Sequence, residues 1–309
     1  MSSTIPPVID LTQDDDDDPL AATTTGTILQ PSPPQPLTTP LASLPRNPSP
    51  STTNLPPEDH RALVKKRTWL QTYSVAVPPD ISRHGSSPVD ATLVFAQQEA
   101  GTAVCISPNG ILLTCAHCVA ESADDLDWRK THWLIFASGA LVAARILAWD
   151  PRRDLALLLI THATSSSSMS PFPYIPLALS AARPGSRLVC VGHPAASDLE
   201  SPIPGTQTGY DTLVLSAGAF RGLAPDRRRD PQDNTEIGAL MHTCWTYWGH
   251  SGAPLVERRT GRLVGVHSSW DHETGMRRGV PWEALVGFLA EFEGAYVGEV
   301  PEGWTWSVT

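Results

Sequence analysis

Between residues 91 and 269 the sequence is a succession of short apolar or alternating runs. Turn residues separate many of them, as at Pro108-Asn109-Gly110, Pro151, Gly185 and Gly261. Many short strands at this spacing favour an antiparallel barrel or sandwich. We therefore expect an all-β fold. The runs are 91–96, 101–107, 111–116, 132–138, 141–149, 155–160, 186–192, 211–220, 237–247, 253–259 and 262–269.

Two helices are predicted outside these runs. Pro57 followed by Glu58 and Asp59 suits a helix start, because proline fits the first helical turn and acids favour its positive end. This short helix extends to about Leu70 and belongs to a helix and linker segment over 58–87. A second helix over 281–296 is expected to close the domain.

Residues 1–57 have a different composition from the rest of the chain. They contain six Asp and one Arg, 13 of the 30 prolines and no aromatic residue. Such a segment cannot bury enough apolar surface to offset the entropy lost on ordering. We expect a disordered, acidic, Pro-rich tail, and a second tail over 297–309.

Charge and cysteine usage exclude several classes of protein. The formal net charge is −10, which argues against nonspecific binding to nucleic acid or to anionic membranes. The N-terminus lacks the pattern of a secretory signal, and no apolar run is long enough to span a membrane. An odd number of cysteines, five, then indicates free thiols in an intracellular compartment.

The sharpest local motif is Gly249-His250-Ser251-Gly252, between two predicted strands. Serine on a tight turn with small neighbours suits a nucleophile, and the N–H groups of Gly249 and Ser251 could form an oxyanion hole. An ordinary glycine turn that contains serine is the alternative reading of this motif alone.

A serine nucleophile needs a base, and the base needs an orienting carboxylate. His117 follows an apolar run, and Asp154 precedes another. Each residue alone could be structural, His117 as a buried histidine and Asp154 as a turn residue. Together with Ser251 they occur in the order His, Asp, Ser, which is the order of chymotrypsin-like enzymes.

Several stretches in the same order resemble the HtrA/DegP branch of trypsin-like serine peptidases over residues 88–292. The resemblance implies two six-stranded antiparallel barrels, a peptidase domain over 88–296, and a protein or peptide substrate without a cofactor. By position, Ser268 resembles the serine that bonds the catalytic aspartate. The stretches are "GTAVCISPNGILLTCAHCV", "DPRRDLALLLI", "GSRLVCVGHP", "LVLSAGAF", "GHSGAPLV", "GRLVGVHSS" and "GVPWEALVGFL".

The sequence departs from this family pattern at several places. His250 stands where secreted trypsins have Asp, so activation by a freshly cut N-terminus is not expected, and Ala253 replaces Gly. Only a short segment follows the predicted closing helix in this sequence, so we do not expect a PDZ domain after it. Trp245, at the expected base of the primary pocket, argues against cleavage after Arg or Lys. Trp245, Trp248 and Trp270 either line the cleft or belong to the core.

His250 also keeps one alternative function open, a catalytically inactive protease fold that binds peptides or SUMO. A zinc site is a further alternative, because Cys115 and Cys118 have zinc-knuckle spacing. No second Cys or His pair of close spacing completes such a site, so no metal is expected.

The stretch Val8-Ile9-Asp10-Leu11, followed by Asp14 to Asp18, resembles a SUMO-interacting motif. An extended apolar segment can add to the edge of a sheet, and the acidic run can meet a basic rim. The resemblance implies SUMO or SUMO-modified proteins as partners and favours the nucleus over the cytoplasm. A solvating acidic tail with incidental aliphatic residues is the alternative.

Overall fold

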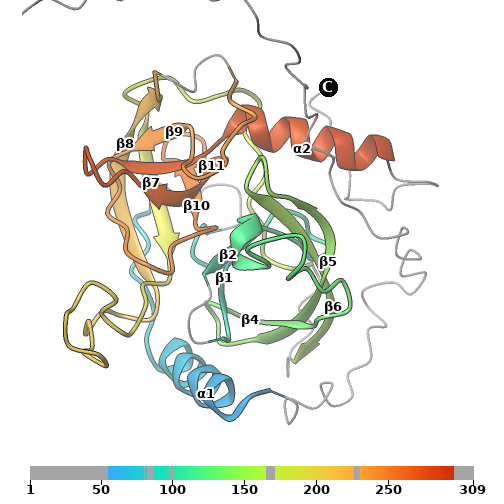
Figure 1. Cartoon of the computed structure of the whole chain (residues 1–309), viewed down its shortest axis with the longest axis vertical. Coiled ribbons are helices and arrows are strands. Elements are labelled where there is room, and N and C mark those ends of the chain that lie inside the picture. Colours follow the sequence, from blue (N-terminus) through green and yellow to red (C-terminus); the bar gives the residue numbers. More distant parts are fainter. Residues whose placement is uncertain are drawn as a thin grey trace, which may run out of the picture.

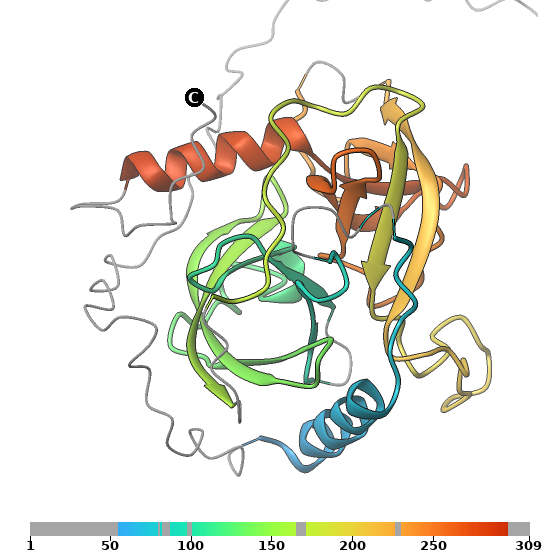
Figure 2. The same ribbon diagram turned by 180° about the vertical axis from the view of Figure 1, so that it is seen from behind.

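The computed structural model describes residues 55–79, 81, 87–97, 101–164, 171–225 and 230–295. Within these residues, twelve strands form two closed six-stranded antiparallel barrels, and a helix follows them (Figures 1 and 2). This confirms the predicted fold. The tail with Val8, Ile9 and Leu11 and the segment 297–309 lie outside the described residues. None of the described helices has the length and apolar character needed to cross a membrane.

The first barrel closes in the order β1–β2–β3–β6–β5–β4, because β1 pairs with both β2 and β4. Fully buried side chains such as Leu93, Leu112 and Trp149 fill it, and Phe136 stacks on Phe172 at 5.9 Å between ring centroids. The strands are β1 (Thr92–Phe95), β2 (Thr102–Cys105), β3 (Ile111–Thr114), β4 (His132–Phe136), β5 (Leu141–Asp150) and β6 (Leu155–Thr164).

The second barrel closes in the order β10–β11–β12–β9–β8–β7. Each of the eleven predicted runs contains one strand of the two barrels, whereas the twelfth strand, β12, was not predicted. Its sequence, Arg-Arg-Gly-Val-Pro, has no apolar alternation, and its pairing with β11 and β9 sets its conformation. The strands are β7 (Arg187–Gly192), β8 (Val214–Leu223), β9 (Leu240–His242), β10 (Pro254–Glu257), β11 (Arg262–Trp270) and β12 (Arg277–Pro281).

Both predicted helices are present. Helix α1 (Pro57–Thr72) packs Leu63 and Leu70 against the first barrel. Its Lys66 ammonium donates to the carbonyl oxygens of Phe95 at 2.8 Å and Gln97 at 2.6 Å, and burial lowers the pKa of Lys66 to about 7. Helix α2 (Trp282–Ala295) buries one apolar face in a core cluster shared by both barrels.

Hydrogen bonds between the barrels hold the turn that carries Ser251. The N–H of Thr102, on β2, donates to the Ser251 carbonyl at 2.8 Å, and the Thr102 hydroxyl donates to the Gly249 carbonyl at 2.9 Å. The same hydroxyl accepts from the N–H of His193 at 3.0 Å. The start of the first barrel therefore fixes a turn of the second barrel.

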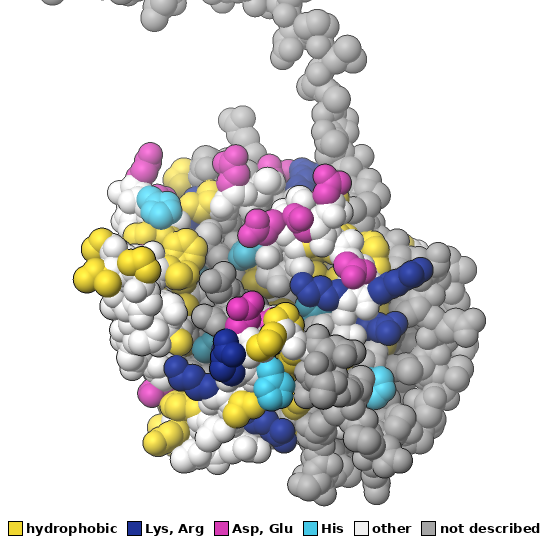
Figure 3. Space-filling view, turned by 60° about the horizontal axis from the view of Figure 1, so that its bottom comes forward, with side chains coloured by type: hydrophobic (Ala, Val, Ile, Leu, Met, Phe, Trp, Pro, Cys, Tyr) yellow, Lys and Arg dark blue, Asp and Glu magenta, His cyan; other side chains and the backbone are white. Residues whose placement is uncertain are grey.

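The surface turned toward the viewer in Figure 3 mixes charges of both signs. Acidic and basic side chains are interspersed over the middle of this face, and hydrophobic side chains gather at its left. Large exposed hydrophobic residues include Leu199, Ile203 and Tyr210, in the segment between β7 and β8. This segment therefore exposes several apolar side chains.

Candidate active site

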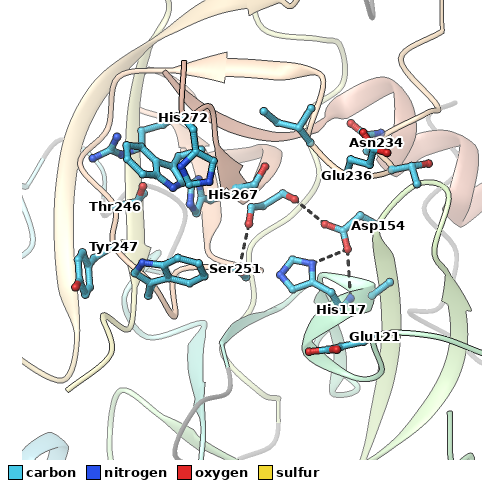
Figure 4. Close-up of a pocket in the computed structure, with 18 of the residues that line it drawn as sticks. His117, Glu121, Asp154, Asn234, Glu236, Thr246, Tyr247, Ser251, His267 and His272 are labelled. Carbon is cyan, nitrogen blue, oxygen red and sulfur yellow. Dashed lines mark hydrogen bonds and ion pairs between the residues drawn. The ribbon is translucent and has the colours of Figure 1, made fainter. Parts of the chain in front are cut away.

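One cleft of about 830 Å³ contains all three residues predicted as the triad, His117, Asp154 and Ser251 (Figure 4). His117 lies on a single 3₁₀ turn, η4 (Ala116–Cys118), directly after β3. Asp154 lies in the turn between β5 and β6, and Ser251 in the turn before β10. Two of the side chains thus come from the first barrel and one from the second.

The carboxylate of Asp154 accepts hydrogen bonds from both barrels. Its Oδ1 lies 2.8 Å from Nδ1 of His117 and 3.3 Å from the His117 backbone nitrogen. The Ser268 hydroxyl donates to Oδ2 at 2.6 Å. Asp154 also has φ 54°, a left-handed conformation that few residues other than glycine adopt. The structure therefore brings Ser268 to the position that the resemblance implied for it.

Burial and charge act in opposite directions on this pair. Burial lowers the pKa of His117, but the charge and hydrogen bond of Asp154 outweigh it, so the pKa lies above its ordinary value. Burial raises the pKa of Asp154, but the charge of His117 and the hydrogen bonds from His117 and Ser268 lower it by more. The pKa of Asp154 therefore lies below its ordinary value. Asp154 is consequently held as a carboxylate that favours the imidazolium form of His117.

The Ser251 hydroxyl donates to the carbonyl oxygen of Ser268 at 3.0 Å. No hydrogen bond joins Ser251 to His117 among the described residues. Serine χ1 has three staggered wells, so a change of rotamer can redirect Oγ, and hydrogen bonds of this kind are often loose in ligand-free structures. In this structure the hydroxyl of the candidate nucleophile is therefore bonded to Ser268 and not to His117.

The turn before Ser251 has a backbone conformation that requires glycine at position 249. Gly249 has φ 90°, and a Cβ there would lie 2.5 Å from the His193 carbonyl oxygen, so only glycine fits. The His250 N–H donates to the Tyr247 carbonyl at 3.0 Å. The N–H groups of Gly249 and Ser251 have no partner among the described residues. These two groups remain the candidates for an oxyanion hole.

His250, the residue that departs from the family pattern, is fully buried. Its Nδ1 lies 3.0 Å from the Tyr247 carbonyl oxygen, and its ring packs edge-on against Trp245 at 5.4 Å. Burial lowers the pKa of His250 to about 4, so the ring is neutral at neutral pH. A neutral, locally bonded side chain thus supports the turn.

The thiols near His117 are poor candidates for a metal centre. Cys115, His117 and Asp154 place their ligand atoms within 4.8 Å of one another. However, burial raises the pKa of Cys115 well above its ordinary value, and its Sγ donates to the His267 carbonyl at 3.3 Å. A metal would require the thiolate and would compete with the bond between His117 and Asp154. All five cysteines are free thiols in the structure.

The three tryptophans noted in the sequence line the cleft. Trp245 and Trp248 are 36% and 47% exposed, which contradicts the reading that they belong to the core. Tyr210 packs edge-on against Trp245 at 5.1 Å between ring centroids. Sequence reasoning missed Tyr210 and His267 as cleft residues, because both reach the cleft only through the tertiary fold.

Comparisons with known proteins identify the domain that carries this site. A family model for the trypsin-like peptidase domain matches residues 101–266. The serine endoprotease from Yersinia pestis is similar in structure, with a TM-score of 0.50 and 17% identity over 71% of this chain and 69% of that chain. This likeness supports the fold. A search of curated proteins gave no match.

Two further structures are similar at lower scores. A protease from M. tuberculosis in its active form has a TM-score of 0.48 and 19% identity over 75% of this chain and 93% of that chain. The HtrA-type protease AlgW with a decapeptide has a TM-score of 0.46 and 18% identity over 63% of this chain. The present chain covers 52% of AlgW, about half its length.

The buried His250 predicts an acid-sensitive fold. Its pKa is about 4 in the folded protein and about 6.5 when unfolded. Between these values the unfolded chain binds more protons, so stability falls as the pH drops through this window. His250→Asn should remove up to about 3 kcal/mol of this loss, at about 1.4 kcal/mol per pH unit.

Urea unfolding of both proteins between pH 7 and 4 measures this difference. His272→Asn, at an exposed histidine of the same cleft, is the matched control and should follow the parent curve. Parallel curves for the parent and His250→Asn would contradict the role given to burial.

Proposed function

The chain belongs to the trypsin-like peptidase family, and from this premise we propose that it is a serine endopeptidase acting through His117, Asp154 and Ser251. The observation that carries the proposal is the Asp154 carboxylate, bonded to Nδ1 of His117 at 2.8 Å and to Ser268 at 2.6 Å. This bond leaves Nε2 of His117 available as a base in the cleft that contains Ser251.

The reaction follows from the positions of these groups. Ser251 Oγ attacks the carbonyl carbon of the peptide bond while His117 Nε2 takes the hydroxyl proton. The negative oxygen that forms accepts from the N–H groups of Gly249 and Ser251. His117 then gives its proton to the leaving amine, and an acyl-enzyme remains on Ser251. Water, deprotonated by His117, attacks the ester and releases the acid.

Asp154 acts on His117 rather than on the substrate. Its Oδ1 accepts a hydrogen bond from the Nδ1–H of His117, which places the lone pair on Nε2 and aims the ring toward the cleft. Its negative charge stabilises the imidazolium that forms when Ser251 loses its proton. The Ser268 hydroxyl, bonded to Oδ2, restrains rotation of the carboxylate.

Removing either reacting group should abolish turnover. We expect Ser251→Ala or His117→Ala to lower kcat by about 10⁶-fold, which is roughly 8 kcal/mol at about 1.4 kcal/mol per decade. Cleavage of a mixed peptide library by purified protein measures this loss. Ser138→Ala, in the exposed turn between β4 and β5, is the control and should cleave like the parent. Cleavage by Ser251→Ala at the parent rate would show that another residue is the nucleophile.

We also propose that the N-terminal tail directs the enzyme to SUMO or to SUMO-modified proteins, which favours the nucleus. Support comes from the sequence alone, the apolar residues Val8, Ile9 and Leu11 followed by Asp14 to Asp18. Such a segment can bind as an added strand. A tail of this length tethers the peptidase near a modified protein and raises its effective concentration.

A titration of a peptide of residues 1–25 against isotope-labelled SUMO tests this tether. We expect binding on the order of micromolar, or about −8 kcal/mol, that weakens with added salt because the aspartates are exposed charges. NMR shifts should be confined to the groove strand of SUMO and disappear when Ile9→Ala and Leu11→Ala are combined. Absence of shifts at millimolar peptide would refute the proposal.

A further inference from the structure

The mechanism leaves a group of polar residues in the cleft unused. His267, Thr246 and Arg277 line it together with Ser251, and Figure 4 shows His267 and Thr246 on the same side of the cleft. All three come from the second barrel or the segment before Ser251. Side chains at such a place meet the part of a substrate closest to the attacked carbonyl.

His267 is held firmly next to the triad. It is 5% exposed and precedes Ser268 on β11. Its N–H donates to the Ala253 carbonyl at 2.8 Å, and its carbonyl accepts from the Gly252 N–H at 2.8 Å. The backbone of His267 is therefore bonded to the two residues that follow Ser251, Gly252 and Ala253. These bonds fix the position of His267 relative to the nucleophile.

A second buried histidine supports the ring of His267. Nε2 of His242, on β9, lies 3.0 Å from Nδ1 of His267, and the two rings are perpendicular. This bond uses Nδ1 of His267 and leaves Nε2 for the cleft. Burial lowers the pKa of His267 well below its ordinary value, so the ring is neutral in the free protein, and its Nε2 carries a proton when its Nδ1 accepts from the Nε2–H of His242.

Two polar atoms in this region lack a protein partner. Within the described residues, neither Nε2 of His267 nor the hydroxyl of Thr246, a residue 4% exposed, is hydrogen-bonded to another residue. An apolar substrate side chain would strip water from both groups and give no bond in return, which costs affinity. A side chain that accepts two hydrogen bonds would satisfy both.

The charges around His267 are positive or neutral. The titratable groups that act on it are His242, His250, Arg277 and His117. Arg277 forms no ion pair within the described part of the chain. Its guanidinium lies 5.5 Å from the centre of the Trp270 ring, and its Nη1 donates to the Gly275 carbonyl at 3.1 Å. A cation without a counter-ion attracts an anion and repels a lysine or arginine side chain.

The carboxylates of the cleft lie elsewhere. Figure 4 shows Glu121 and Glu236 on the side of Asp154, across the cleft from Thr246. Glu200 also lines the cleft and lies close enough to Tyr247 to affect its ionisation. The buried rings of His242 and His250 are neutral at neutral pH because burial lowers their pKa to about 3 and about 4, so Arg277 supplies the positive charge on this side of the cleft.

We propose that this pocket binds the carboxylate of an acidic side chain, so that the enzyme cleaves after glutamate or aspartate. The carboxylate accepts from Nε2 of His267 and from the Thr246 hydroxyl, and Arg277 supplies long-range charge. The inference rests on the proposed peptidase function, because the pocket is defined by its position beside Ser251. It also accounts for the expected absence of cleavage after Arg or Lys.

Peptides that differ only at the cleaved residue test the preference by kinetics. We expect kcat/KM for Glu to exceed that for the isosteric Gln and for Leu by about 10-fold or more. Thr246→Val keeps the shape of the side chain and should lower kcat/KM for Glu by about 10-fold, with little change for Leu. His162→Ala, on β6 of the first barrel, is the control and should keep the preference. Equal rates for Glu and Gln, or faster cleavage after Leu, would overturn the inference.

A binding experiment separates the pocket from the chemistry. Ser251→Ala protein keeps the pocket, and calorimetry can compare two product peptides that end in Glu or in Gln. We expect the Glu peptide to bind about 10-fold tighter and to shift the His267 ring signals in NMR toward the protonated form. Equal affinities would refute the acidic pocket even if the enzyme is an active peptidase. Tighter binding of the Glu peptide would support the pocket even if Ser251 proved not to be the nucleophile.

Discussion

The buried carboxylate of Asp154 joins the two barrels at the cleft. It comes from the turn between β5 and β6, yet it accepts hydrogen bonds from His117 of the first barrel and Ser268 of the second. A buried charge without partners is strongly unfavourable, so these bonds are needed for the barrels to dock with Asp154 ionised. The contact between the barrels and the candidate triad therefore share the Asp154 carboxylate. The bond from Thr102 to the Ser251 carbonyl adds the nucleophile turn to that assembly.

Much of this arrangement is encoded locally and could be predicted from sequence. The strands form from runs whose apolar residues fill a barrel, and His117, Asp154 and Ser251 are recognisable by their order. Strand β12, which the sequence analysis did not predict, shows the limit of local prediction. Its pairing with β11 and β9 determines its extended conformation more than its own residues do. The bond between His242 and His267 was not predictable for the same reason. It depends on strand register and on the bulge between His267 and Ser269, which re-aims side chains and is not evident from residue alternation.

Two histidines with opposite pKa shifts give the cleft its pH behaviour. His117 must be unprotonated to act as a base, and the charge of Asp154 raises its pKa despite burial. His250 must stay neutral to remain buried, and burial lowers its pKa to about 4. The raised pKa of His117 extends its protonated form to higher pH, whereas His250 stays neutral until the pH approaches about 4. His267 is a third buried histidine of the cleft, and burial lowers its pKa well below the ordinary value as well.

Active-site labelling with a fluorophosphonate tests the central claim most directly, because the reagent reports a hydroxyl that a base activates and needs no knowledge of the substrate. The account predicts an intact-mass increase of one label per chain, located on Ser251 by peptide mapping and absent from the His117→Ala protein. A folded parent protein that takes up no label, or that carries it at another serine, would contradict the claim and favour a peptide-binding scaffold without catalysis.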